Sequence, residues 1–178
     1  MPDYEIIDGR ARAKGPMFKG SREESQAERR KDKKAIVEKE SRNKSMARRR
    51  DSWACRFPRC SCHQLRLHPE VAHVDGDKGM GGDHGERSAI KQLICLCKPR
   101  HQDSRISVHK GTLRIEFLSA DKANGAVRWW VDVAKLDDPL TPDVEWQCVA
   151  EESQVRVLKP LTADQGAILE RIRELAQK

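Results

Sequence analysis

The pattern of apolar and polar residues predicts β-strands in the second half of the chain. Residues 105–116 alternate around Lys110-Gly111, which is typical of a β-hairpin with a tight turn. Residues 126–133 and residues 146–157 have the apolar and β-branched content of two further strands. We therefore expect an antiparallel sheet in this region.

A terminal helix is predicted after this sheet. From Thr162 onward, apolar residues recur at helical spacing and define one face, namely Ile168, Leu169, Ile172 and Leu175. Thr162 fits the N-cap position, and Gln165, three residues later, completes a capping box. The apolar face can pack on a partner or on the protein's own core, and the small size of the domain favours its own core.

The first 50 residues follow a different pattern. Residues 1–20 show no clear period, whereas residues 21–50 contain good helix formers, no Pro and no Gly. Their apolar residues are too few for a continuous face, which indicates a solvated helix or one that orders on DNA. We predict a basic arm over residues 1–47, helical or partly disordered, ahead of one folded domain over residues 48–178.

The excess positive charge of the chain lies in its N-terminal part. Residues 1–50 hold 16 Lys and Arg against 9 Asp and Glu, whereas the remaining residues hold 19 of each. Lys and Arg displace counterions from phosphates, so a basic arm on a neutral body is typical of DNA-binding proteins. The same arrangement also fits a solvated tail. We expect DNA as the partner, with Arg48, Arg49 and Arg50 contacting phosphate.

From the sequence we expect neither a signal peptide nor a membrane-spanning segment. Its N-terminus lacks an apolar stretch, and no apolar run approaches the roughly 18 residues that span a bilayer. We therefore predict a cytoplasmic protein. In a reducing compartment its six cysteines favour metal binding over disulfides.

Two short pairs of ligand-type residues predict a zinc site. Four residues separate Cys55 from Cys60, and three separate Cys97 from His101. Such spacers let two side chains of one turn converge on one tetrahedral ion, and thiolate and imidazole are ligands that zinc favours. We predict structural Zn²⁺ held by these four residues. Other residues could replace one of them, namely Cys62, His63 and Cys95.

Three segments of the chain resemble the HNH (ββα-metal) endonuclease family. Residues 48–60 resemble its entry, in which an Arg-Asp pair and an aromatic residue precede two cysteines. Residues 71–83 resemble its histidine strand and glycine-containing loop, and residues 92–102 resemble its closing segment, in which a Leu-Cys pair precedes a histidine. The resemblance implies an α+β protein of phage or prophage type. Its small zinc-bound ββα-metal core would be followed by a β extension and a terminal helix.

The same resemblance implies a metal-dependent DNA endonuclease. His73 takes the place of the family's general base, and His101 that of the histidine that binds a catalytic cation, Mg²⁺ or Mn²⁺. Ala72 stands where the family has a further cation ligand, Gln92 where it has asparagine, and Arg100 where a fourth zinc cysteine often lies. If zinc requires His101, the cation site is lost, and the alternative is a non-catalytic zinc-dependent DNA-binding protein with the same fold.

Overall fold

The computed structural model describes residues 4–7, 10–13, 19–63, 69–74 and 89–175. In this part of the chain, no helix combines the length and the apolar character needed to cross a membrane. Internal contacts divide the protein into two units, Met1–Glu38 and Lys39–Lys178.

The first unit contains a two-stranded sheet and the beginning of a long helix. Strands β1 (Tyr4–Ile7) and β2 (Arg10–Ala13) pair antiparallel, and they lie in a region for which the sequence predicted no regular element. Helix α1 (Lys19–Arg50) has 32 residues and confirms the helix predicted over residues 21–50. The side chains of residues 26–39 are exposed, as expected for a helix without an apolar face.

Two charged side chains join the C-terminal end of α1 to the rest of the second unit, to which this end belongs. Asp51 is fully buried, and its Oδ2 accepts a hydrogen bond of 2.8 Å from the backbone N of Cys95. Arg50 donates to Asp51 Oδ1 at 2.8 Å and to the carbonyl of Leu93 at 2.5 Å. The Arg-Asp pair therefore ties the end of the helix to one strand of the following hairpin.

That hairpin consists of β3 (Pro69–His73) and β4 (Leu93–Cys97), which pair antiparallel from Pro69↔Cys97 to His73↔Leu93. All five residues of β4 are buried, which confirms the strand expected around Cys95. Short helical turns precede or follow these strands along the chain: η1 (Ser61–His63) before β3, η2 (Ile90–Gln92) before β4 and the π-helical η3 (Pro99–Asp103) after β4.

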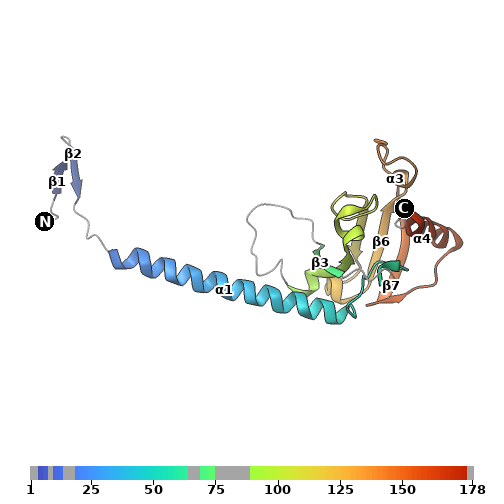
Figure 1. Cartoon of the computed structure of the whole chain (residues 1–178), viewed down its shortest axis with the longest axis horizontal. Coiled ribbons are helices and arrows are strands. Elements are labelled where there is room, and N and C mark those ends of the chain that lie inside the picture. The colour runs from blue at the N-terminus through green and yellow to red at the C-terminus, as the bar shows by residue number, and fades with distance from the viewer. Residues whose placement is uncertain (1–3, 8–9, 14–18, 64–68, 75–88, 176–178) are drawn as a thin grey trace. The chain divides into compact units, whose positions relative to one another are not determined.

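A four-stranded antiparallel sheet forms the larger layer of the second unit (Figure 1). Its order is β5 (Leu113–Phe117), β6 (Val127–Asp132), β7 (Trp146–Gln154) and β8 (Val157–Leu158). The turn η4 (Lys122–Asn124) joins β5 to β6, and the short helix α3 (Ala134–Asp137) follows β6. The strand predicted over residues 126–133 is therefore confirmed, whereas the one predicted over residues 146–157 ends at Gln154, and the chain turns there into β8. The mixed α+β class, with helices and antiparallel sheets, is confirmed as well.

The hairpin predicted over residues 105–116 is wrong. The turn at Lys110-Gly111 exists, and Gly111 adopts a φ of 70°. However, the backbone N–H groups of Val108 and His109 bond to carbonyls of η3, each at 3.0 Å. Because these donors are already used, the first half of the segment cannot pair as a strand, and β5 pairs with β6 instead.

Helix α4 (Ala163–Leu175) closes the core against β7. Thr162 Oγ1 accepts from the N of Gln165 at 3.2 Å, and Gln165 Oε1 accepts from the N of Thr162 at 3.0 Å, which confirms the capping box. Leu169 and Ile172 are buried in the main core cluster, and Ile168 and Leu175 pack against it. The apolar face of α4 thus covers the protein's own core.

Adjacent tryptophans on β6 face opposite sides of the sheet, as strand alternation predicts. Trp129 is fully buried, and its indole N–H donates to Glu152 Oε1 at 3.2 Å. Trp130 is half-buried and donates to Glu116 Oε2 at 2.7 Å on the other face. The face of the sheet that carries Trp129 is therefore the one that packs against the core.

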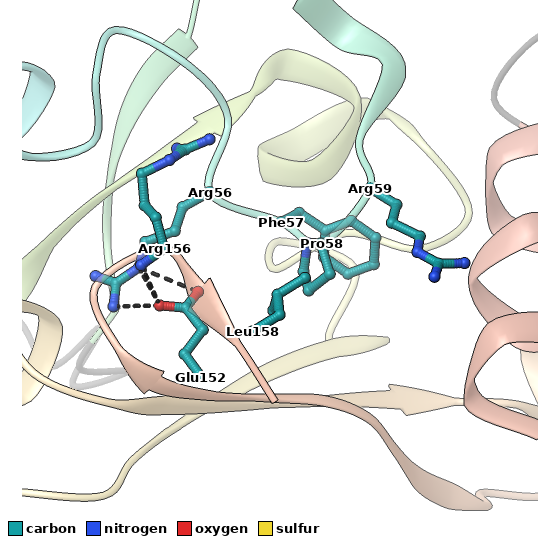
Figure 2. Close-up of a pocket in the computed structure, with 7 residues that line it drawn as sticks. All are labelled: Arg56, Phe57, Pro58, Arg59, Glu152, Arg156 and Leu158. Atoms are coloured by element: carbon teal, nitrogen blue, oxygen red, sulfur yellow. Dashed lines mark hydrogen bonds and ion pairs between the residues drawn. The ribbon is translucent and has the colours of Figure 1, made fainter. Parts of the chain in front are cut away.

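A buried ion pair attaches the loop after α1 to this sheet. Figure 2 shows Arg56 beside Glu152 of β7, where Arg56 Nη2 lies 2.7 Å and Nε 2.9 Å from Glu152 Oε2. Both side chains are shielded from solvent, and Arg56 also donates to the carbonyls of Ala123 and Gly125. The neighbouring Phe57 packs edge-on against Trp129, with ring centroids 5.6 Å apart. These contacts fix the backbone that follows Cys55.

Candidate metal centre

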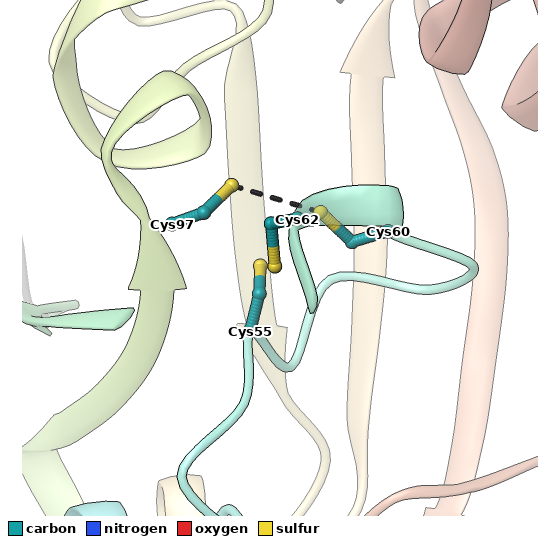
Figure 3. Close-up of side chains that lie close together, drawn as sticks. All are labelled: Cys55, Cys60, Cys62 and Cys97. Atoms are coloured by element: carbon teal, nitrogen blue, oxygen red, sulfur yellow. Dashed lines mark hydrogen bonds between the residues drawn. The ribbon is translucent and has the colours of Figure 1, made fainter. Parts of the chain in front are cut away.

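Four cysteines converge at the junction between this loop and the β3–β4 hairpin. Cys55, Cys60 and Cys62 come from the loop and η1, and Cys97 is the last residue of β4 (Figure 3). Their sulfur atoms all lie within 4.8 Å of one another, and the Sγ atoms of Cys60 and Cys97 are 3.6 Å apart. All six cysteines of the chain are free thiols. The group is therefore a candidate metal site.

The loop geometry explains how residues close in sequence reach one point. The N of Arg56 donates to the carbonyl of Cys95 at 2.8 Å, which places Cys55 beside β4. A tight turn follows, in which Arg59 has a φ of 51° and the N of Cys60 bonds to the carbonyl of Phe57 at 3.3 Å. This turn directs Cys60 back toward Cys55, and η1 adds Cys62.

The separation of the sulfur atoms fits a tetrahedral zinc ion. A Zn–S distance of about 2.3 Å in a tetrahedron gives sulfur–sulfur edges of about 3.8 Å. The 3.6 Å between Cys60 and Cys97 is close to that edge, whereas a disulfide needs about 2.05 Å. Soft thiolate donors favour zinc over hard cations such as Mg²⁺. The four residues can therefore hold zinc, which would link the loop to β4.

The thiols in this group perturb one another strongly. Hydrogen bonding to Cys55 lowers the pKa of Cys60, and the same partner lowers the pKa of Cys62. Burial, followed by hydrogen bonds to the other three thiols, raises the pKa of Cys55 well above its ordinary value. For Cys97 the hydrogen bond to Cys55 lowers the pKa, but contacts with Cys60 and Cys62 and burial raise it on balance. The cluster thus favours thiolate on Cys60 and Cys62 and the neutral thiol on Cys55 and Cys97, so metal binding would release protons from the latter two.

Cys62, rather than His101, is the fourth member of this group. The imidazole Nδ1 of His101 in η3 instead lies 2.7 Å from Glu70 Oε2, and Gln102 donates to the same carboxylate oxygen at 3.0 Å. The ring of His101 also makes an edge contact with His109, with centroids 4.5 Å apart. Three of the four predicted ligands, Cys55, Cys60 and Cys97, are therefore brought together, and His101 is not one of the group.

The remaining cysteines lie elsewhere. Cys95 is fully buried beside Asp51, where burial and then the Asp51 charge raise its pKa to about 12. It stays a neutral thiol at physiological pH and acts as a small apolar core residue. Cys148 is half-buried on β7, and burial raises its pKa as well. The side chain of His63 lies outside the described part of the structure.

His73, the predicted general base, is the last residue of β3 and is exposed. Alternation along the strand places Glu70 and Ala72 on one face and His73 on the other. Ala72 is fully buried, so it offers no ligand where the family has one. The segment after Val74, with the glycine cluster and the candidate ligands Asp75 and Asp77, lies outside the described residues, as does His68.

The three predicted phosphate-contacting arginines have different surroundings. Arg50 is engaged with Asp51 and with the carbonyls of Ile90 and Leu93. Arg49 is exposed, and Arg48 lies over the ring of Trp53, with its guanidinium carbon 6.0 Å from the centroid. Arg50 therefore supports the fold, whereas Arg48 and Arg49 remain near the surface.

Glu70 is a candidate site residue that the sequence did not reveal. Its role becomes visible only when the β3–β4 register and η3 bring it to His101.

Searches of protein-family models, of the curated proteins and of the solved structures gave no match to this chain.

Proposed function

We propose that this chain is an HNH-like, zinc-stabilised DNA endonuclease that hydrolyses phosphodiester bonds. The observation that carries the proposal is that the thiolate group is complete without His101. A four-cysteine zinc site leaves that imidazole available for a second ion. His101 is then not needed to replace the zinc cysteine that the family often has at the position of Arg100. The basic charge of residues 1–50 supports DNA as the substrate.

Glu70 and His101 are the residues that would hold the catalytic cation. A carboxylate oxygen and an imidazole nitrogen 2.7 Å apart are the donor types that suit Mg²⁺ or Mn²⁺ with several water ligands. Glu70 would supply the carboxylate that the family has at the position of Ala72. When bound, a divalent cation stabilises negative charge on the phosphate and on the leaving oxygen.

His73 would act as the general base, on a phosphodiester that passes the end of β3, where a side chain on the face opposite Glu70 can reach the same substrate. The side chain is exposed at the end of β3, where a water molecule and a phosphodiester can reach it. A neutral imidazole near pH 7 accepts a proton from water and so generates the nucleophile. Buried β4, held by Asp51 and Arg56, gives this strand a fixed position.

Purified protein incubated with supercoiled plasmid and Mg²⁺ or Mn²⁺ is expected to produce nicked circles. His73→Ala should lower the nicking rate by a factor of about 10² to 10⁴, because general-base catalysis is lost. Lys110→Ala, an exposed change in a turn, is the control and should leave the rate unchanged. Absence of nicking by the wild type, or equal nicking by His73→Ala, would contradict the nuclease proposal.

A second candidate is a DNA-binding protein that keeps the zinc site without catalysis. Ala72 favours it, because this buried methyl group occupies the position of a cation ligand. This candidate predicts salt-sensitive DNA binding by wild type and His73→Ala alike, with no cleavage by either. The plasmid assay therefore separates the two candidates.

A further inference from the structure

An exposed tryptophan lies directly after the basic helix. Trp53 has 57% of its surface exposed, although large aromatic side chains of this size are usually buried. The only side chain stacked with it in the described residues is that of Arg48, whose guanidinium carbon is 6.0 Å from the ring centroid. One face of the indole is thus associated with a cation, and much of the ring remains open to solvent.

The backbone that presents this ring is strained. Ser52 and Trp53 both adopt left-handed conformations, with φ values of 56° and 54°, which non-glycine residues rarely adopt. The N of Trp53 bonds to the carbonyl of Arg48 at 2.7 Å, and the N of Ser52 bonds to that of Arg49 at 3.0 Å. These are the two hydrogen bonds of a Schellman helix end, where glycine makes the turn at the lowest cost. Here the turn instead holds a large ring on the surface, which burial does not stabilise.

The surroundings of Trp53 are strongly basic. Residues 39–50, the part of α1 that belongs to the second unit, contain six Lys and Arg and one acidic residue, Glu40. Arg50 is held by Asp51, whereas Arg42 and Arg49 are exposed. Charge complementarity therefore favours a polyanion as the occupant of this surface.

We propose that Trp53, flanked by Arg48 and Arg49, is a stacking platform for an unpaired base of single-stranded nucleic acid. The arginines would bind the backbone phosphates, and the indole face would stack on the base. Bases within a duplex already stack on their neighbours, so an exposed indole gains this contact only at an unpaired or displaced base. The inference rests on the nucleic-acid binding in the proposed function and adds a substrate class to it.

The test compares strands that differ only in their bases. Fluorescein-labelled oligothymidylate, an abasic strand of the same length and a duplex of that length are titrated with the full-length wild type and with Trp53→Asn. Asparagine tolerates the left-handed backbone, so this variant removes the ring without disturbing the turn. Ser52→Gly keeps the ring and relaxes the turn, and Leu140→Ala removes another exposed apolar side chain, which has 90% exposure.

Wild type should bind oligothymidylate more tightly than the abasic strand. Trp53→Asn should weaken oligothymidylate binding by roughly 5- to 100-fold, the effect of losing one aromatic–base stack, and should leave abasic binding unchanged. Ser52→Gly and Leu140→Ala should bind as the wild type does. Unchanged metal content and melting temperature would show that each variant is folded.

The two possible failures are distinguishable. If Trp53→Asn binds oligothymidylate as tightly as the wild type, while binding remains salt-sensitive, the stacking role is overturned and the proposed function survives. If the wild type binds none of the three nucleic acids, both are overturned, and the surface belongs to a partner of another class, such as a protein.

Discussion

Cys60→Ser is expected to abolish metal binding and to unfold the second unit of the protein. Structural zinc contributes roughly 10–16 kcal/mol of apparent binding free energy in zinc-finger peptides, and a whole domain has a stability of about 5–15 kcal/mol. Here the ion would join the loop carrying Cys55, Cys60 and Cys62 to the end of β4. Its loss should therefore remove much or all of the stability, measured as loss of cooperative thermal unfolding by circular dichroism.

The matched control for this change is Cys148→Ser. Cys148 is also a free thiol, but it lies on β7 outside the four-cysteine group. This variant should keep both the metal and the cooperative transition. A chelator added to the wild type should reproduce the effect of Cys60→Ser. A Cys60→Ser protein that melts like the wild type would show that the cluster does not stabilise the fold through a metal.

Glu152→Gln is expected to lower the free energy of unfolding by about 3–5 kcal/mol, because it removes the nearer counter-charge of a buried guanidinium and leaves only Asp51, at 3.9 Å. Arg56 has no solvent-exposed side-chain surface, and the exposure of Glu152 is 1%. The carboxylate also accepts hydrogen bonds from the Trp129 indole at 3.2 Å and from the N of Arg156 at 3.0 Å. Urea denaturation of the metal-loaded protein measures the change.

An exposed pair provides the comparison for this prediction. Glu170 lies 3.3 Å from Arg173 on α4, and both side chains are largely exposed. Glu170→Gln should change the stability by less than about 1 kcal/mol, because solvent screens such pairs. The double variant Arg56→Met/Glu152→Gln should recover part of the loss, since it removes the unpaired charge. Equal stabilities of Glu152→Gln and Glu170→Gln would contradict the structural role of the buried pair.

Periodicity was sufficient for elements whose pattern is local. The terminal helix follows from four apolar residues at helical spacing and from the Thr162 and Gln165 cap, and all of these positions have the predicted role. The strand containing Trp129 and Trp130 follows from alternation, which also predicts that the two rings face opposite sides. In both cases the signal lies within one element, so long-range contacts were not needed.

The hairpin over residues 105–116 failed because its hydrogen bonds go elsewhere. Alternation predicted a strand, but Ser107 and Thr112 bond to the local backbone, and Val108 and His109 bond to η3. Side-chain hydroxyl groups that compete for backbone partners are a local signal against a strand. The hydrogen bonds of Val108 and His109 depend on the position of η3, which could not be deduced from the sequence of this segment.

Three members of the metal-ligand group were predictable from the sequence, but the fourth was not. The spacing of Cys55, Cys60 and Cys97 points to a tetrahedral site, and the structure brings these residues together. The choice of the fourth ligand depends on backbone direction. The turn at Arg59 and η1 direct Cys62 inward, whereas η3 directs His101 toward Glu70. Both features are tertiary, so spacing alone favoured His101 as the fourth ligand and left Cys62 only as a possible replacement.

The metal content of two variants tests the central claim, that four thiolates and no imidazole hold one ion. Elemental analysis of the purified wild type should give one zinc per chain. Cys62→Ala should lose the zinc, and His101→Ala should retain it. Retention by Cys62→Ala together with loss from His101→Ala would contradict the claim, because the ion would then be held by three cysteines and a histidine.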